Sequence, residues 1–521
     1  MSRCFTRHVR LVWGAAAAML LVTACQHAGQ IARLSAGTDE RFASAERRLA
    51  VLDRVTWGVN VSSARQIEES GVEAYLERQL KPGVAVLPSA VQAQIDAMTI
   101  SQKPLDALLF DVEKRRRAFL ALQEPTERRA AQRAYQQELT RLGREAATRS
   151  LLRAIYSPNQ LEEQMTWFWM NHFNVFQLKG NLRAMIGDYE ANAVRPHALG
   201  RFRTLLGATA RHPAMLRYLD NAQNAAGRIN ENYARELMEL HTLGVDGGYT
   251  QEDVQELARI LTGVGLALTA NVPKVRPDRE GDYVRAGAFE FNPNRHDYGD
   301  KVFLGQRVKG AGLVELDEVL DRLARHPSTA RFISRKLALY FVADDPPAEL
   351  VERLARTFEA TDGDIAATLR ALFRSPEFAA SLGRKFKDPV HYVVSALRAS
   401  YDDRPLANAG PALLWLNRMG QGLYGHQTPD GYALTQTTWN GPGQMAVRFE
   451  IARAIASGSP PLFAEESAPG DASNSARPTG TPHYAAVRSA LSESTLKALE
   501  QARSPTEWNV YFLSSPEFMH R

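Results

Sequence analysis

Cysteine is nearly absent from this chain, which has only Cys4 and Cys25 among its 521 residues. Both lie within the first 25 residues, so the remainder can form neither a disulfide bond nor a zinc site with cysteine ligands. A strong charge of one sign is also lacking, because 63 Lys and Arg stand against 58 Asp and Glu, a formal net charge of +5. With 45% hydrophobic and 23% charged residues, the composition is that of an ordinary globular protein.

Familiar catalytic signatures are lacking as well. The sequence contains no Gly-x-Ser-x-Gly nucleophile elbow, no His-Glu-x-x-His zinc motif and no phosphate-binding loop. If the protein is an enzyme, its chemistry has to come from residues dispersed along the chain.

Long hydrophobic runs are missing too. The apolar run at residues 11–22 is shorter than the roughly 20 residues of a membrane span. Three arginines precede it, and the sequence Leu-Val-Thr-Ala-Cys25 ends it. This pattern resembles a bacterial lipoprotein signal, with residues 1–24 removed and Cys25 lipidated. A plain secretory signal and an uncleaved anchor are the alternatives.

The expected location follows from that signal. Residues 25–38 are polar and small, and are interpreted as a tether from the lipid. Gln26 follows the cysteine where an Asp would indicate retention at the inner membrane, so by analogy with enteric bacteria we expect the outer membrane, facing the periplasm. Removing residues 1–24 removes three arginines and no acid, which lowers the net charge to +2. This charge does not indicate nucleic-acid binding.

Helical patterning dominates residues 39–521, which are predicted to form one large, mainly α domain of many helices. Two irregular loop insertions are expected at 271–307 and 420–440, the first with a small β-hairpin or an ordered loop. Residues 457–482 are rich in Ser, Pro, Gly and Ala and are predicted to be disordered. The phrase Ser-Pro-Glu-Phe, at residues 375–378 and 515–518, is expected to open a helix in both places.

The arginine-rich segment at 107–150 is predicted to form long exposed helices with a break near Pro125. Its arginines are interpreted as solvated faces. Binding of phosphate or anionic lipid is the alternative.

Residues 230–262 have the clearest local pattern: a helix, a tight turn and a second helix. Asn230 is a plausible N-cap of the first helix. Gly244 suits the left-handed position that follows a helix. Thr250 and Asp253 resemble a capping box at the start of the second helix.

Two faces of the first of these helices differ in character. Ala234, Leu237, Met238 and His241 follow the spacing of an apolar stripe. Another face carries an acid, a base and an acid at intervals of four residues, and a further carboxylate lies next to them. These are Glu231, Arg235, Glu239 and Glu236. A solvated charged face with a buried histidine is the simple interpretation, and a functional site is the other.

Further polar residues occur in three other stretches. Asn171 and His172 end a helix that is predicted to be buried, so His172 is either a hydrogen-bonded core residue or part of a site. His296 and Asp297 lie in the first irregular insertion, and His426 and Asp430 in the second. Loops held by a rigid scaffold often carry function.

Four phrases of the sequence resemble the bacterial "domain of unknown function 1800" family. They are TWFWMNHF at 166–173, the stretch at 230–263, HDYGDKVFLG at 296–305 and LYGHQTPDGY at 423–432. The resemblance covers roughly residues 50–518. It implies a helical secreted or envelope protein, often encoded beside a second secreted protein, in a family without an established activity. Related sequences often have a second His where this chain has Met170, so a metal site on two histidines of that helix is doubtful here.

The matching phrases contain the polar residues already singled out. If the fold brings them together, they supply groups for acid–base chemistry, or for a divalent metal held by carboxylates and histidines. We therefore expect a periplasmic hydrolase or lyase that acts on a polysaccharide-type polymer. The expected catalytic residues are Glu236, Glu239, Arg235, His172 and His296, and the expected substrate-binding residues are Asn171, Asn230, Glu231, Asp297, His426 and Asp430.

The alternative is a lipid-anchored helical scaffold without catalytic activity, which binds a partner in an envelope assembly. The lack of a recognised catalytic signature favours it, as does the arginine-rich segment. The partner expected in that case is the co-encoded secreted protein or an envelope polymer.

Overall fold

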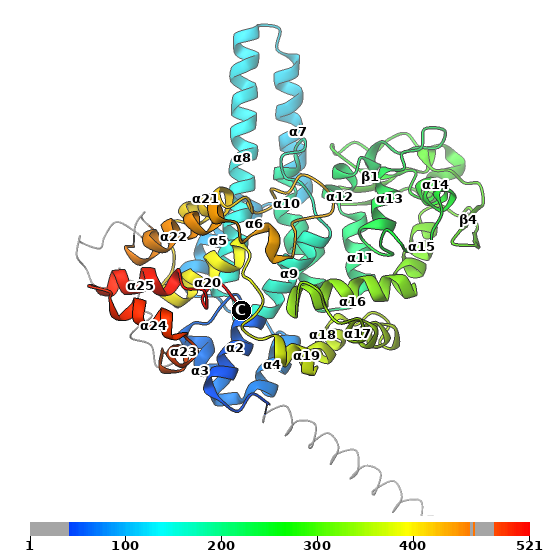
Figure 1. Ribbon diagram of the computed structural model, residues 1–521. Coiled ribbons are helices and arrows are strands. Elements are labelled where there is room, and N and C mark those ends of the chain that lie inside the picture. Colours follow the sequence, from blue (N-terminus) through cyan, green and yellow to red (C-terminus); the bar gives the residue numbers. More distant parts are fainter. Residues whose placement is uncertain (1–40, 459–461, 464–483) are drawn as a thin grey trace, which may run out of the picture.

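The computed structural model describes residues 41–458, 462–463 and 484–521, and these residues are mainly α-helical, as predicted (Figure 1). The predicted signal peptide, Cys25 and the tether at 25–38 lie outside the described residues. So does most of the segment predicted to be disordered, although Leu462 within it is fully buried. Among the described helices, none combines the length and the apolar character that a membrane crossing requires.

The helices of residues 45–80 lie at the lower end of the molecule in Figure 1, and two further helices follow them in the chain. Local capping explains where two of them begin, because the side chains of Ser44 and Asn60 accept hydrogen bonds from first-turn backbone N–H groups. The helices are α2 (Ala45–Val55), α3 (Val61–Ser70), α4 (Val72–Leu80), α5 (Ser89–Asp96) and α6 (Thr99–Gln102).

Two long helices, α7 (Leu105–Ala121) and α8 (Pro125–Tyr156), form a hairpin that projects from the opposite end of the molecule (Figure 1). Pro125 is at the start of α8, where a missing N–H costs nothing. The predicted break near Pro125 and the predicted long exposed helices are confirmed.

Helix α9 (Gln160–His172) lies at the centre of the core. Every residue of it except Glu162 is buried, and it contacts α2, α4 and α8. The Trp169 indole N–H donates to the Ala198 carbonyl at 2.9 Å, so this large ring is buried without losing its hydrogen bond. The segments that follow are η1 (Leu182–Ala184), α10 (Ile186–Asp188), η2 (Tyr189–Val194), η3 (Arg195–His197), α11 (Phe202–Arg211), α12 (Pro213–Tyr218) and η4 (Asn221–Gln223).

The predicted helix–turn–helix is present as α13 (Asn232–Glu239) and α14 (Gln251–Ile260). Thr250 and Asp253 form the expected capping box. Gly244 has φ +83°, the left-handed conformation expected after α13. The chain therefore specifies this hairpin by local chemistry.

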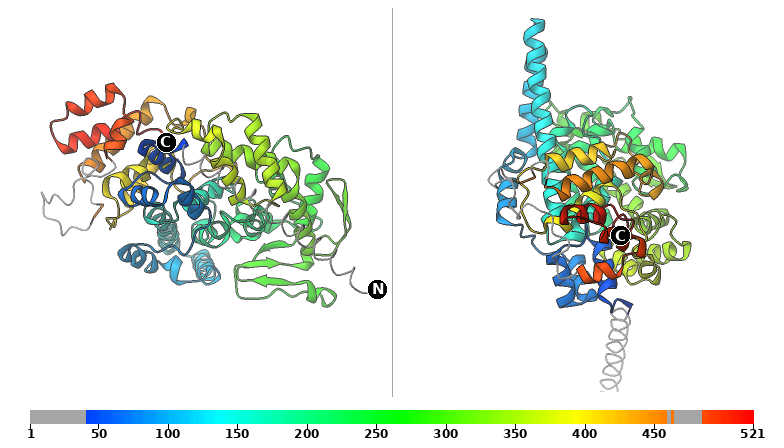
Figure 2. Two further views of the ribbon diagram at one scale, coloured as in Figure 1. Left: turned by 90° about the horizontal axis from the view of Figure 1, so that it is seen from below. Right: turned by 60° about the vertical axis from the view of Figure 1, so that its left-hand side comes forward.

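Short antiparallel strands occupy the first irregular insertion and the residues just before it. β3 (Phe289–Phe291) pairs with both β1 (Val264–Leu266) and β2 (Val284–Ala286). β4 (Lys301–Phe303) pairs with β5 (Gln306–Val308), and both groups of strands are visible in Figure 2. Two short helical turns, η5 (Pro277–Asp282) and η6 (Pro293–Arg295), complete the insertion.

Helices α15 to α19 follow these strands in the chain and extend the helical scaffold. Within it, α16 packs on α17 and α17 on α18. The bounds are α15 (Val314–Arg325), α16 (Pro327–Phe341), α17 (Ala348–Ala360), α18 (Ile365–Phe373) and α19 (Pro376–Ser381).

The C-terminal helices return to the N-terminal ones, because α23 packs on α2. The second irregular insertion, at 420–440, has η7 (Gln436–Thr438) as its one regular element in the described chain. The helices are α20 (Pro389–Tyr401), α21 (Gly410–Arg418), α22 (Pro442–Ala456), α23 (Tyr484–Ser489), α24 (Glu493–Glu500) and α25 (Pro505–Leu513).

Candidate functional site

The end of α9 is fastened to the second irregular insertion. Asn171 Nδ2 donates to the Tyr432 carbonyl at 2.9 Å, and Asn171 Oδ1 accepts from the Tyr432 N–H at 2.7 Å. Gly431 has φ +77°, and a Cβ at this position would lie 2.1 Å from the Asn171 carbonyl oxygen. Glycine is therefore required for this close approach.

Two further side chains fix the same insertion by hydrogen bonds to its backbone. Asn174 Nδ2 donates to the carbonyls of His426, at 3.0 Å, and Thr428, at 2.7 Å. The Tyr218 hydroxyl at the end of α12 donates to the Gln427 carbonyl at 2.7 Å. Residues 426–432 are thus an ordered loop with a fixed position relative to α9 and α12.

His172 is a buried residue with both ring nitrogens hydrogen-bonded. Nδ1 accepts from the Lys336 ammonium at 2.9 Å, because an ammonium can only donate. Nε2 therefore carries the proton and donates to the His241 carbonyl at 3.1 Å. Burial lowers the pKa of His172, and the charge of Lys336 lowers it further, so the ring is neutral. His172 accordingly positions Lys336.

Lys336 lies on α16, on the same face as Phe332 and Tyr340, with its ammonium 5.4 Å from the Phe332 ring centre. Its side chain is only partly exposed. Burial lowers the pKa of Lys336 to about 8, while the negative charge of Asp430 opposes this shift. This lysine can therefore change protonation state close to neutral pH.

Glu236 on α13 is a half-buried carboxyl, and it makes no hydrogen bond or ion pair with the residues that the structure describes. Burial raises its pKa, the charges of Glu239 and Asp430 raise it further, and Arg235 opposes them. Glu236 in turn raises the pKa of the Tyr218 phenol, to which burial contributes most. Glu236 is thus suited to holding a proton and releasing it.

Asp430 has the opposite tendency. Partial burial raises its pKa, but the hydrogen bond from Thr428, at 2.5 Å, and the contact with His426 outweigh this, so the pKa lies below its ordinary value. The distance from Asp430 Oδ1 to His426 Nε2 is 3.3 Å. The Asp430 side chain is 63% exposed, so it is open to a ligand.

Five side chains from four segments therefore influence one another electrostatically or by hydrogen bonds. His172 is hydrogen-bonded to one of them, Lys336. We call Tyr218, Glu236, Lys336, His426 and Asp430 the polar cluster. The pKa values of its two carboxyls, Glu236 and Asp430, are shifted in opposite directions, as expected of a proton donor and a carboxylate that act together.

Three predicted residues, two on α13 and one at its N-cap, form a surface network instead. Arg235 contacts Glu231 at 3.2 Å and Glu239 at 3.5 Å, as the spacing predicted. Gln251 links Arg235 and Glu231. Glu239 also raises the pKa of Tyr249 through a hydrogen bond, after burial, to about 12. These side chains brace α13 against α14.

Asn230 lies at the beginning of α13. Its Oδ1 accepts from the Asn232 N–H at 3.0 Å, as expected of a capping side chain, although Glu231 occupies the N-cap position itself. Its own N–H donates to Asn224 Oδ1 at 2.9 Å. Its observed contacts therefore shape the chain before the helix.

The structure does not bring His296 and Asp297 to the polar cluster. His296 is buried, with Nε2 at 3.0 Å from Glu315 Oε1, and Glu315 also pairs with Lys301 at 2.6 Å. Asp297 pairs with Arg259 at 2.8 Å. Both residues fasten the β insertion to α14 and α15.

A metal site built on protein side chains is not indicated. In the described ranges, no group of three or more His, Cys, Asp or Glu residues is arranged to hold a metal ion. The sequence left a divalent metal possible, and the described residues do not supply a set of ligands for it.

Sequence reasoning did not select Lys336, Tyr218 or Asn174 as site residues. One signal was present for Lys336, because a lysine stood on a helix face otherwise occupied by Phe332 and Tyr340. Nothing local distinguished Tyr218 or Asn174, since their roles depend on contacts with residues more than 200 positions away.

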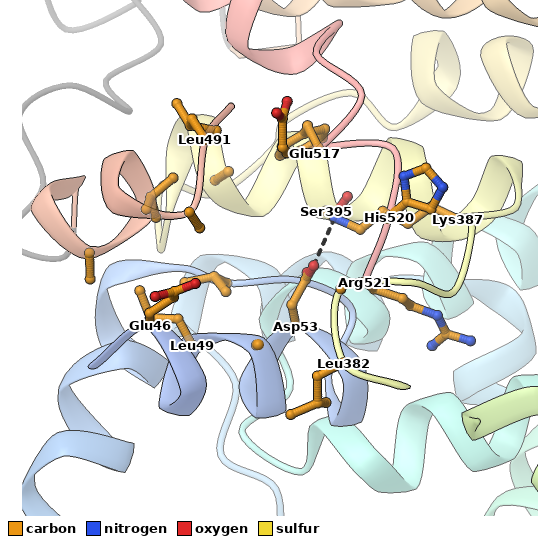
Figure 3. A pocket seen from close by; sticks show the side chains of 18 of the residues that line it. Glu46, Leu49, Asp53, Leu382, Lys387, Ser395, Leu491, Glu517, His520 and Arg521 are labelled. Atoms are coloured by element: carbon orange, nitrogen blue, oxygen red, sulfur yellow. Dashed lines mark ion pairs between the residues drawn. The ribbon is translucent and has the colours of Figure 1, made fainter. Parts of the chain in front are cut away.

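A separate cavity of about 300 Å³ lies between α2, α20 and the C-terminal helices (Figure 3). Three of its charged side chains are already paired: Lys387 contacts Asp53 at 3.1 Å, and Glu517 accepts from the Ser492 N–H at 2.8 Å. The polar cluster does not line it.

Comparison with known proteins identifies the family. No curated protein and no solved structure matches the chain. A family sequence model described as "Protein of unknown function (DUF1800)" matches residues 50–520, a range that includes the whole polar cluster. The resemblance seen in the four sequence phrases is confirmed, and the chain belongs to the DUF1800 family.

Proposed function

We propose that this protein is a cell-envelope hydrolase that acts on a polysaccharide-type polymer, with Glu236 and Asp430 as its acid–base pair. The observation that carries the proposal is the contrast between these two carboxyls. Glu236 is half-buried, without a partner among the described residues, and has a raised pKa, whereas hydrogen bonds stabilise the charged form of Asp430. Glycoside hydrolysis uses two carboxyl groups with such different roles.

In the proposed reaction, Glu236 donates its proton to the glycosidic oxygen that leaves. Asp430 takes a proton from the water whose hydroxyl adds to the anomeric carbon, or attacks that carbon itself before water completes the reaction. His426 and Thr428 orient Asp430, to which they are hydrogen-bonded. Lys336, fixed by His172, supplies positive charge that favours the carboxylate form of Asp430 before it reacts.

The test measures the release of reducing ends from a panel of envelope polysaccharides by the wild-type protein and by Glu236→Gln. Glutamine keeps the shape but cannot donate the proton, so we expect turnover to fall by roughly 10²–10⁴-fold with unchanged melting. Glu252→Gln, at an exposed position of α14, is the matched control and should retain full turnover.

Two outcomes contradict the proposal. Equal turnover by Glu236→Gln and the wild type removes Glu236 from the reaction, and absence of turnover by the wild type on every polymer removes the reaction. New double bonds in the product, detected by their ultraviolet absorbance, would assign the protein as a lyase instead of a hydrolase.

The expected location belongs to the same proposal. A lipid anchor at Cys25 would hold the protein at the outer membrane, where envelope polymers are within reach. A non-enzymatic binding role remains the second candidate, and the projecting hairpin of α7 and α8 is the feature that favours it (Figure 1).

A further inference from the structure

The outer part of the α7–α8 hairpin extends beyond the core. Buried residues of α7 end at Glu113, and those of α8 begin at Tyr135. We call the intervening residues 114–134 the hairpin tip. Phe119 on α7 packs against Tyr135 on α8 at 5.3 Å between ring centres, which holds the two helices together at the base of the tip. Most helices in proteins gain their stability by burying an apolar face, and this tip buries very little.

The hairpin tip is strongly basic. It contains seven Lys and Arg residues and two Glu residues, a net charge of +5, which equals the formal net charge of the entire chain. Arg115 pairs with Asp111, and Arg116 and Arg117 pair with Glu113. The remaining four cations make no ion pair with described residues: Lys114, Arg128, Arg129 and Arg133.

An apolar residue stands between these cations. Leu120 is 54% exposed, near the turn that joins α7 to α8. Ala121 follows it and is exposed as well, and Leu122 is partly exposed. Basic side chains around an exposed apolar end match the interface of an anionic bilayer, where the charges meet headgroups and the apolar residue enters the acyl boundary.

We infer that the hairpin tip is a docking surface for an anionic lipid bilayer. Arg128, Arg129 and Arg133 lie on one helix, α8, and each would contact phosphate headgroups. Leu120 would enter the membrane interface. A soluble anionic polymer would meet the same charges but offers no apolar region for Leu120, whereas a bilayer interface offers both.

The position of the tip makes this contact possible without moving the core. In Figure 1 the hairpin projects well beyond the neighbouring helices, and α2 and α3 lie at the opposite end of the molecule. Figure 2 shows the same projection from a second direction. A planar surface can therefore reach the tip before it meets the rest of the fold.

The test is co-sedimentation of the full-length protein with vesicles of phosphatidylcholine alone or with about one third phosphatidylglycerol. All proteins carry Cys25→Ser, which removes the predicted lipid, so any binding by residues 1–40 is common to every variant. The tip variant replaces Arg128, Arg129 and Arg133 by Gln. The control variant replaces Arg331, Arg356 and Arg384 by Gln, which are also exposed.

We expect binding to depend on phosphatidylglycerol and to weaken with salt. A basic residue near such a surface contributes roughly a fivefold gain in affinity, so the tip variant should lose about a hundredfold. The control variant should lose less than about threefold, and Leu120→Asn should lose about fivefold on anionic vesicles.

Three outcomes overturn the inference. One is equal binding to both kinds of vesicle, and another is an equal loss in the tip and control variants, which would reflect net charge alone. The third is tight binding to polyglutamate that the tip variant loses while its vesicle binding is unchanged, which would identify an acidic protein as the partner.

Discussion

At the scale of single residues, the interior of this protein holds His172 and His241 neutral. His172 has both ring nitrogens hydrogen-bonded, and burial and Lys336 lower its pKa. His241 lies beside it, with 6.1 Å between the ring centres, and its Nε2 has no partner among the described residues. Burial lowers the pKa of His241 to about 3, and Lys336 adds to the effect. Protonating either ring inside the fold is therefore unfavourable.

This predicts an acid-sensitive fold. In the unfolded chain His241 takes up a proton near pH 6.5, whereas in the folded chain it does so only near pH 3. Between these values the unfolded state binds more protons, so the free energy of unfolding is highest above about pH 7 and decreases as the pH falls. At pH 5 the contribution of His241 is a loss of about 2 kcal/mol.

Urea unfolding of His241→Phe at pH 7 and pH 5 measures this contribution. The variant should lose about 2 kcal/mol less than the wild type between the two pH values, because phenylalanine binds no proton. Phe341→Leu is the control, since it alters the core without removing a titratable group, and its loss of stability between the two pH values should equal that of the wild type. The same pH dependence in His241→Phe and the wild type would contradict the prediction.

At the scale of elements, the site depends on a loop that other elements hold in place. Asn171 and Asn174 at the end of α9, with Tyr218 at the end of α12, fix residues 426–432 by hydrogen bonds to the backbone. Since the backbone itself is held, the side chains at 426 and 430 have defined positions. A substitution that displaces this loop should therefore disturb the polar cluster, even though it replaces none of the cluster's side chains.

Gly431→Ala tests this dependence. Its Cβ would lie 2.1 Å from the Asn171 carbonyl oxygen, so the loop has to move, and we expect a destabilisation of about 3 kcal/mol. Gly420→Ala is the matched control, because Gly420 has nearly the same φ, +78°, and open space around its missing Cβ. The control should lose only about 1 kcal/mol in urea unfolding. Equal losses in the two variants would show that the close approach to Asn171 is unimportant.

Local chemistry explains which parts of the elements were predictable. The capping box of Thr250 and Asp253 and the left-handed Gly244 depend on residues a few positions apart, and both were predicted. The phrase Ser-Pro-Glu-Phe opens a helix at 375–378, but the predicted helix at 515–518 is wrong. There Glu517 accepts hydrogen bonds from Ser492 and Thr495 at the start of α24. These contacts hold residues 516–519 in a turn.

The site itself was less predictable because it is assembled by distant contacts. Glu236, His426 and Asp430 were selected by their setting in the sequence, and the fold brings them together. Lys336 and Tyr218 belong to the cluster through partners far along the chain. His296 has the same local character as His426, yet its partner Glu315 places it in a buried structural hydrogen bond.

At the scale of the whole molecule, buried polar side chains join segments from both ends of the chain. Arg398 on α20 is the clearest case. Its Nε donates to the Gly58 carbonyl at 2.9 Å, and its Nη2 donates to Asn60 Oδ1 at 3.0 Å. It also donates to the Ile155 carbonyl at the end of α8. One side chain thus connects α3, α8 and α20, and the single domain predicted for the helical region stays a prediction that the next experiment tests.

Arg398→Leu should therefore weaken the entire fold and not one part of it. Leucine fills much of the space but leaves the acceptors of Gly58, Asn60 and Ile155 without donors, so we expect a loss of about 3 kcal/mol. Arg65→Leu, at an exposed position of α3, should change stability by less than about 0.5 kcal/mol.

Urea unfolding followed by circular dichroism and by tryptophan fluorescence should give one coincident transition, shifted to lower urea, because residues from both ends share these contacts. Two separate transitions in the variant would mean that the N-terminal and C-terminal helices unfold independently, and that Arg398 joins two domains.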